Sequence, residues 1–293
     1  MRILLDAKDV INLVEHSDPI SLPEFDAYLR RHNAELALTF TVIREFVGPI
    51  AIKGNFLEIR PSLQAIEGLP LAYLREGPIF AEEIKAALQA FRTGAEPARI
   101  DPYVRRWDYT FAWPGPSPAE IFVGYRLDEI VYSVYRKSPH IFRPYADAGR
   151  RLRDQFAAER QLPGTVRKNL RDNFADSVRK HAIQWRIDCG STDREVFGHW
   201  IYDDPSRCPG LRLSYDAYHE LLANLGDDPK NSDIPDFAHL SAIPYVDLAT
   251  LDRRMIHYCA AVVRKLQGQG LKTDYARYVY PSLSHLLKGA PKP

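Results

Sequence analysis

Several patterns that would assign a function at once are scarce or missing from this 293-residue chain. It has three scattered cysteines, Cys189, Cys208 and Cys259, and no CxxC pair, which argues against a zinc knuckle or a disulfide framework and suits a reducing compartment. It has no P-loop and no serine or cysteine in a nucleophile elbow. These absences remove the commonest nucleotide-binding and covalent-catalysis classes.

Long apolar runs and a large net charge are missing as well. No run reaches the roughly 18 apolar residues of a membrane-spanning helix, and Asp6 and Asp9 interrupt the stretch where a signal peptide would have its apolar core. Thirty-nine Lys and Arg balance 38 Asp and Glu, so bulk charge does not indicate a nucleic-acid partner. We expect a soluble, cytoplasmic protein with no membrane partner.

The first hundred residues alternate between strand-like and helix-like segments. Apolar runs at 2–5, 35–41 and 68–73 are typical of strands, and helices are expected to about residue 31, around Glu45 and over 79–91. The first helix opens with the capping box Ser21-Leu-Pro-Glu24, and the second should end near Gly48-Pro49. This alternation predicts an α/β fold, a central parallel sheet flanked by helices.

The sequence changes in character over residues 101–209. This part is rich in Tyr, Trp, Arg and Pro, carries a second capping box at Ser117-Pro-Ala-Glu120, and predicts a long helix or helix pair over 144–186. Beyond it, helices at 213–226, 236–242 and 253–266 alternate with strands at 246–251 and 276–280. We therefore predict a discontinuous domain, 1–100 and 210–293, interrupted by a mostly helical insertion over 101–209.

Four acids lie where such a fold gathers its functional groups, at the carboxyl ends of parallel strands. Asp6 and Asp252 follow apolar strands, and Glu45 and Asp236 lie on helices that could border the same edge. Four converging carboxylates would repel one another unless a hard divalent cation lay between them. The pattern favours a Mg²⁺ or Mn²⁺ site, whose chemistry is phosphodiester hydrolysis.

The segments around these acids resemble a PIN domain, the metal-dependent ribonuclease fold. The matching segments are LLDAKDVINL, TFTVIREF and DFAHLSAIPYVDLATLDRRM, within residues 1–97 and 211–285. The resemblance implies a PIN-like sheet, with Thr250 as a supporting hydroxyl. It also implies one catalytic and metal-binding quartet, made of Asp6, Glu45, Asp236 and Asp252. Two departures are the long gap between Glu45 and Asp236, and Lys8, a residue that could compete with a cation for the carboxylates.

The function expected from the resemblance is a Mg²⁺- or Mn²⁺-dependent endoribonuclease, with RNA as its substrate and single-stranded DNA as a second option. Two alternatives stay open: a non-catalytic PIN-like module that binds RNA or serves as a protein scaffold, and a structure-specific DNA nuclease. A second copy of the chain and a separate inhibitor protein remain open as partners.

Other residues near the quartet have competing interpretations. Asp233 could replace Asp236 as a ligand or could begin the short helix as its N-cap. His239 could be a ligand or a phosphate contact, although a packed core histidine is the preferred interpretation. Asp247 is expected to begin a strand or end a turn, outside the site.

The insertion is locally basic. Between Arg136 and Arg186 thirteen Lys or Arg face five acids, with aromatic residues between them. This pattern predicts either a surface on which arginines hold phosphates and aromatic rings stack on bases, or a solvated helical face above an aromatic core. The aromatic residues in question are Tyr135, Phe142, Tyr145, Phe156 and Trp185.

Overall fold

A six-stranded sheet is the centre of the molecule. The computed structural model describes residues 1–15, 19–52, 55–75, 79–104, 110–111, 120–121, 126–137, 154, 157–158, 161, 169–228, 230, 233–271 and 278–289. Within these residues the strand order is β4-β3-β2-β1-β7-β8, and all neighbouring pairs except β3–β4 are parallel. The predicted α/β architecture with a mostly parallel sheet is confirmed.

The strands match the apolar runs of the sequence closely. They comprise β1 (Arg2–Leu4), β2 (Glu35–Thr39), β3 (Leu71–Leu74), β7 (Leu248–Thr250) and β8 (Val279–Tyr280). The added edge strand is β4 (Tyr103–Val104), which runs antiparallel to β3. Strand β1 lies between β2 and β7, with Ile3 opposite both Leu36 and Leu248.

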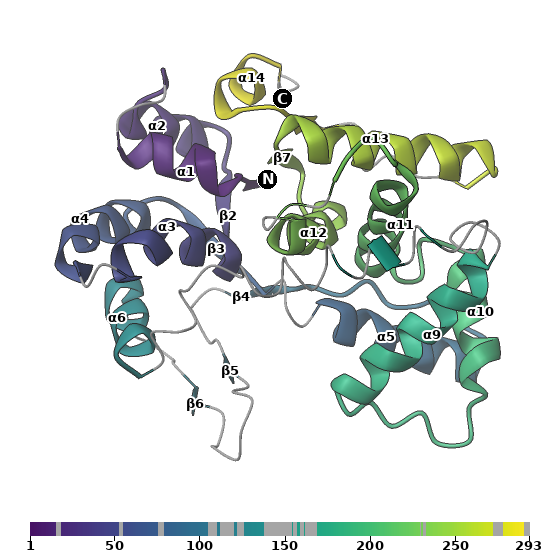
Figure 1. The fold of residues 1–293 in the computed structure, drawn as a ribbon. Helices are drawn as coiled ribbons and strands as arrows, with labels where there is room; N and C mark the ends of the chain where they lie inside the picture. Colours follow the sequence, from purple (N-terminus) through teal and green to yellow (C-terminus); the bar gives the residue numbers. More distant parts are fainter. Residues whose placement is uncertain are drawn as a thin grey trace.

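Both faces of the sheet are buried, because alternate side chains of β1 enter different cores. Ile3 and Leu5 belong to one hydrophobic cluster and Leu4 to another, as the period of two in a strand requires. The first cluster is covered by α1 (Ala7–Val14), α2 (Leu22–Arg31), α3 (Phe40–Ile52), α4 (Phe56–Glu67) and α14 (Leu283–Gly289). Figure 1 shows these helices together on one side of the molecule.

The second cluster is covered mainly by the C-terminal half of the chain. Its helices are α11 (Pro209–Ala223), α12 (Asp233–Ala242), the 3-10 turn η2 (Ile243–Tyr245) and α13 (Arg253–Gly268). Helix α5 (Ile79–Thr93) begins in this cluster at Ile79 and continues into a third one.

Local signals predicted one helix start correctly and one helix end wrongly. The capping box at Ser21 is formed, with the Ser21 side chain bonded to the Glu24 N–H and the Glu24 carboxylate to the Ser21 N–H. Helix α3, expected to end near Gly48-Pro49, continues to Ile52. The burial of Phe46 and Val47 in the core outweighs the local helix-breaking signal.

The segment 101–209 is helical only in part. Its described elements are β5 (Thr110–Phe111), β6 (Glu120–Ile121), α6 (Leu127–Lys137), α9 (Leu170–Gln184) and α10 (Arg194–Asp203). Strands β5 and β6 pair with each other, so the helix start predicted at 117–120 is wrong at Glu120, and residues 117–119 lie outside the described residues. Of the long helix predicted over 144–186, only α9 is substantially described. Figure 1 shows α9 and α10 beside α5, where the three build the third core.

Among the described residues, no helix has both the length and the apolar character needed to cross a membrane.

Candidate metal centre at the carboxyl edge of the sheet

Two of the four predicted acids are brought together by the pairing of β1 with β7. Asp6 follows β1 and Asp252 follows β7, and these strands are parallel neighbours. The Asp6 N–H donates to Thr250 Oγ1 at 2.9 Å, and Thr250 is fully buried. This bond ties the end of one strand to the end of the other and fixes both acids at the same edge.

Asp6 and Asp252 also begin the helices that follow them. Asp6 Oδ1 accepts from the Lys8 N–H at 3.0 Å, and Asp252 Oδ1 accepts from the Met255 N–H at 2.6 Å. The positive end of a helix dipole favours a carboxylate at each position. Among the described residues neither Oδ2 accepts a hydrogen bond, so one oxygen of each carboxylate is available to a ligand.

The Asp236 carboxylate lies close enough to the other three acids to be affected by their charges. Helix α12, which carries it, packs against both α3, the helix of Glu45, and α13, which Asp252 begins. Burial raises the pKa of Asp236 to about 8, and the negative charges of Asp252, Glu45, Asp6 and Asp233 raise it further in that order. Like charges act this way only when they lie close together. The other acids are therefore near enough to Asp236 for their charges to raise its pKa, although no three of the four carboxylates have oxygens within 4.8 Å of one another.

The four acids are of a type that suits a hard cation. The donor set is made of carboxylate oxygens alone, which Mg²⁺ and Mn²⁺ prefer. No side chain among the described residues donates a hydrogen bond or an ion pair to the Asp236 carboxylate, although its pKa is raised by neighbouring negative charge. A divalent cation would remove the repulsion that the protein itself leaves in place.

The neighbouring Asp233 is the first residue of α12 rather than its N-cap, and it has a different environment from Asp236. Its fully buried carboxylate is paired with Arg254 and accepts from the Lys230 N–H at 2.7 Å. Arg254 is held in turn by Asp227 at 2.7 Å. Asp233 is therefore neutralised by an arginine, whereas Asp236, one turn away, faces other acids.

Asp247 lies at the opposite edge of the sheet. Its Oδ2 accepts from the Arg2 N–H at 2.7 Å, and its N–H donates to the Arg2 carbonyl at 2.9 Å. These bonds place it before β7, at the start of β1, as a residue that opens the strand. Asp247 therefore lies at the start of the strand, as predicted, and at the opposite end of β7 from Asp252.

Among the described residues, the side chains of His239 and Lys8 form no hydrogen bond with the four acids. His239 is buried, with 4% of its surface exposed, which agrees with a packed histidine, although its Nδ1 has no hydrogen-bond partner among the described residues. The Lys8 side chain is exposed, and its contact with Asp6 is made by the backbone N–H.

In the described part of the basic insertion, several positive charges form ion pairs with acids of the same protein. Arg171 forms a bidentate pair with Asp203, at 2.8 and 2.7 Å. Arg179 and Lys180 both pair with Asp176. Tyr135 packs against the main core and stacks on Phe56, and Trp185 is 36% exposed. Phe142, Tyr145 and Phe156 lie outside the described residues.

One buried carboxylate, Glu83 on α5, was not singled out in the sequence. It is 2% exposed and accepts from the Gly210 and Leu211 N–H groups at 2.6 and 2.9 Å and from the Tyr245 hydroxyl. It thereby caps α11, whose own N-cap residue, Cys208, provides no side-chain bond. Only the fold could show this role, because Glu83 and Gly210 are far apart in the chain.

Comparison of the chain with protein-family models, with curated proteins and with solved structures gives no match in any of the three.

Proposed function

We propose that this protein is a metal-dependent nuclease that hydrolyses phosphodiester bonds in RNA. The observation that carries the proposal is the environment of Asp236, where burial and the charges of four other acids raise the pKa of a carboxylate to about 8. Repulsion between carboxylates does not stabilise a protein, and a bound cation would offset the repulsion around Asp236. RNA as the substrate rests on the resemblance of three sequence segments to PIN nucleases.

The residues that would hold Mg²⁺ or Mn²⁺ are Asp6, Glu45, Asp236 and Asp252. When bound, such an ion supplies an activated water and stabilises charge on the oxygens of the scissile phosphate. The protein contributes the positions of the ligands. Thr250 holds the backbone of Asp6, and the first turns of α1 and α13 hold one oxygen of Asp6 and of Asp252.

The four acids differ in how exposed they are to solvent, and this difference indicates from which side a substrate would enter. Asp252 is exposed, whereas Asp6, Glu45 and Asp236 are partly buried. A phosphate would therefore approach from the Asp252 side, with Asp236 on the inner side of the site. Because a metal stabilises the ionised form, binding would lower the pKa of Asp236 and keep it ionised at neutral pH.

The test uses the purified chain with RNA and with single-stranded DNA, in Mn²⁺ or in EDTA. Asp6→Asn should lower the rate of RNA cleavage by about 100-fold or more, since a metal contributes several kcal/mol to such a reaction. Asp101→Asn is the matched control, because Asp101 is exposed and contacts Arg2 at the opposite edge; its rate should equal that of the wild type.

Three outcomes would contradict the proposal. The first is that neither nucleic acid is cut, which would favour the scaffold alternative. The second is cleavage that survives both EDTA and Asp6→Asn, which would indicate a contaminant or a different site. The third is cleavage of single-stranded DNA alone, which would retain the metal centre and change the substrate.

A further inference from the structure

A second group of metal-binding side chains lies far from the sheet edge, between α9 and α10. These two helices approach very closely, because residue 198 is a glycine. A Cβ atom at Gly198 would lie 2.5 Å from the Ala175 Cα, closer than real side chains come. Phe174 and Phe197 pack in the core directly beneath. The close approach brings the neighbours of these residues, on the outer side of the pair, within contact distance.

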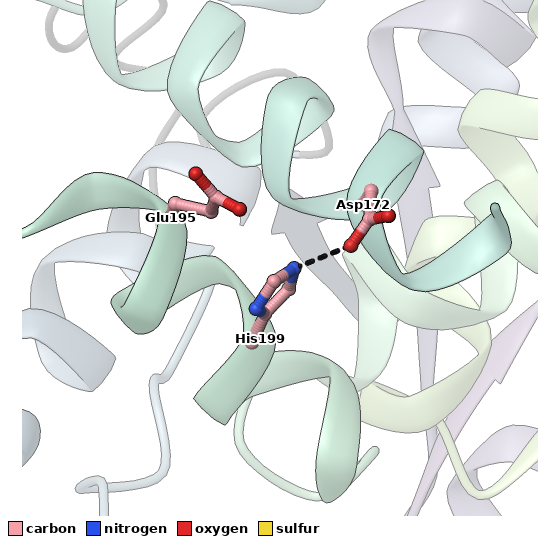
Figure 2. A group of neighbouring side chains, drawn as sticks. All are labelled: Asp172, Glu195 and His199. Atoms are coloured by element: carbon pink, nitrogen blue, oxygen red, sulfur yellow. Dashed lines mark hydrogen bonds and ion pairs between the residues drawn. The ribbon is translucent and has the colours of Figure 1, made fainter.

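Three side chains meet there, as Figure 2 shows. Asp172 comes from the first turn of α9, and Glu195 and His199 come from successive turns of α10. One ligand atom from each lies within 4.8 Å of the other two. His199 Nε2 lies 2.8 Å from Asp172 Oδ1. Residues four apart on a helix share one face, so Glu195 and His199 can bind one ion together.

The positions of the two helices are fixed by a neighbouring ion pair. Arg171, adjacent to Asp172, binds Asp203 with two hydrogen bonds, and Asp203 lies one turn beyond His199. Bidentate arginine–carboxylate pairs hold a defined geometry. The Arg171 guanidinium is therefore engaged by Asp203. Among the described residues, the Glu195 carboxylate has no hydrogen bond or ion pair.

We propose that Asp172, Glu195 and His199 form a binding site for a Zn²⁺-class transition-metal ion that joins α9 to α10. The donor set contains one imidazole nitrogen and two carboxylate oxygens. Imidazole suits Zn²⁺ and its first-row neighbours, whereas Mg²⁺ and Ca²⁺ prefer oxygen ligands alone. Three protein ligands leave at least one coordination position for water.

This site differs in kind from the sheet-edge centre and does not depend on the nuclease proposal. The quartet offers only carboxylates and is partly buried. The α9–α10 site includes a histidine that is 17% exposed and an aspartate that is 64% exposed. An ion bound to both helices stabilises their folded pairing by mass action. Zn²⁺ should therefore stabilise the α9–α10 unit, and Mg²⁺ should not replace it.

Calorimetric titration of the full chain with Zn²⁺ tests the site. Asp236→Asn serves as the background, because that change weakens metal binding at the sheet edge. In this background we expect one equivalent of Zn²⁺ to bind and to raise the melting temperature. Adding His199→Gln or Asp172→Asn should weaken this binding at least about tenfold, the effect that even an outer-shell change produces. Asp172 is exposed, so its variant folds even if the His199 variant does not.

His257→Gln is the matched control, since His257 is exposed on α13; it should bind Zn²⁺ as its background does. Co²⁺ in place of Zn²⁺ provides a second readout, because its visible absorption reports a nitrogen ligand and should be lost with His199→Gln. The proposal is overturned if Zn²⁺ affinity is unchanged by both His199→Gln and Asp172→Asn. It is also overturned if no Zn²⁺ binds once Asp236 is changed.

Discussion

Two carboxylates that are shielded from solvent, the buried Glu83 and the partly buried Asp236, have opposite surroundings. At the α5–α11 contact, Glu83 receives hydrogen bonds from two backbone N–H groups and one tyrosine hydroxyl. At the carboxyl ends of the strands, Asp236 is under the influence of four other negatively charged acids. Burial raises the pKa of both, to about 7 for Glu83 and to about 8 for Asp236. The pKa alone would not distinguish them.

The two carboxylates differ in the direction in which their neighbours shift the pKa. The donors around Glu83 lower its pKa and partly offset burial, which is the arrangement of a structural residue. The neighbours of Asp236 raise its pKa, and Asp233 on the same helix shows that the fold can provide an arginine where one is needed. A carboxylate buried without donors beside like charges is typical of a functional site.

The largest effect is expected where a structural carboxylate loses its cation. Arg254→Met leaves the fully buried Asp233 unpaired, and breaking a buried pair costs about 3–5 kcal/mol. Urea unfolding should show a loss of that size. Arg253→Met, which changes the exposed neighbour, should change the free energy of unfolding by less than about 0.5 kcal/mol. Equal losses in the two variants would mean that Asp233 does not depend on Arg254.

Removal of the cap of α11 should cost slightly less. Glu83→Ala leaves two buried N–H groups and the Tyr245 hydroxyl without their acceptor, and we expect a loss of about 2–4 kcal/mol. Glu82→Ala is the matched control, because Glu82 is partly exposed and pairs with Arg75; its loss should stay below about 1 kcal/mol. Chemical denaturation at pH 6 measures both. A Glu83→Ala protein as stable as the control would show that Glu83 does not hold α11.

In metal-free buffer, removing the Asp236 charge should stabilise the protein, whereas the two preceding substitutions should destabilise it. The pKa of Asp236 in the folded protein, about 8, exceeds the ordinary aspartate value of 3.8, so the wild type loses stability as pH rises from about 4 to 8. Asp236→Asn carries no such charge and should be more stable than the wild type at pH 8, on the order of 1–3 kcal/mol. The difference should disappear near pH 4.

Unfolding curves at pH 5 and pH 8 in EDTA measure this difference, and Mg²⁺ provides its control. Added Mg²⁺ should stabilise the wild type and leave Asp236→Asn unchanged, because the variant lacks one ligand. If Asp236→Asn were less stable than the wild type at pH 8, the acids would not repel one another, and the contrast with Glu83 would fail.

The smallest effect is expected for Lys8. Its side chain is exposed and its bond to Asp6 is made by the backbone, so Lys8→Ala should keep this bond. We expect a change within about 0.5 kcal/mol in stability and within about twofold in the rate of RNA cleavage. A large gain in cleavage on Lys8→Ala would show that the ammonium group competes with the metal.

The sheet could be predicted from the sequence because its strands are short apolar runs separated by capped helices. The same reasoning failed where contacts with distant parts of the chain outweighed a local sequence signal. Pro49 predicts the end of α3, but core packing carries the helix to Ile52. Glu120 suits a helix start, but β6 pairs with β5.

The sequence by itself determined that Asp6 and Asp252 follow apolar strands of a parallel sheet, because an apolar run is a local pattern; that these strands are neighbours is a finding of the structure. It also named Glu45 and Asp236 as their companions. Only the tertiary structure decided that Asp236 faces the acids while Asp233 faces Arg254, and that Asp172 meets Glu195 and His199. The reason is physical: the pKa of a carboxylate and the geometry of a metal site depend on burial and on charges from distant segments, which no local pattern contains.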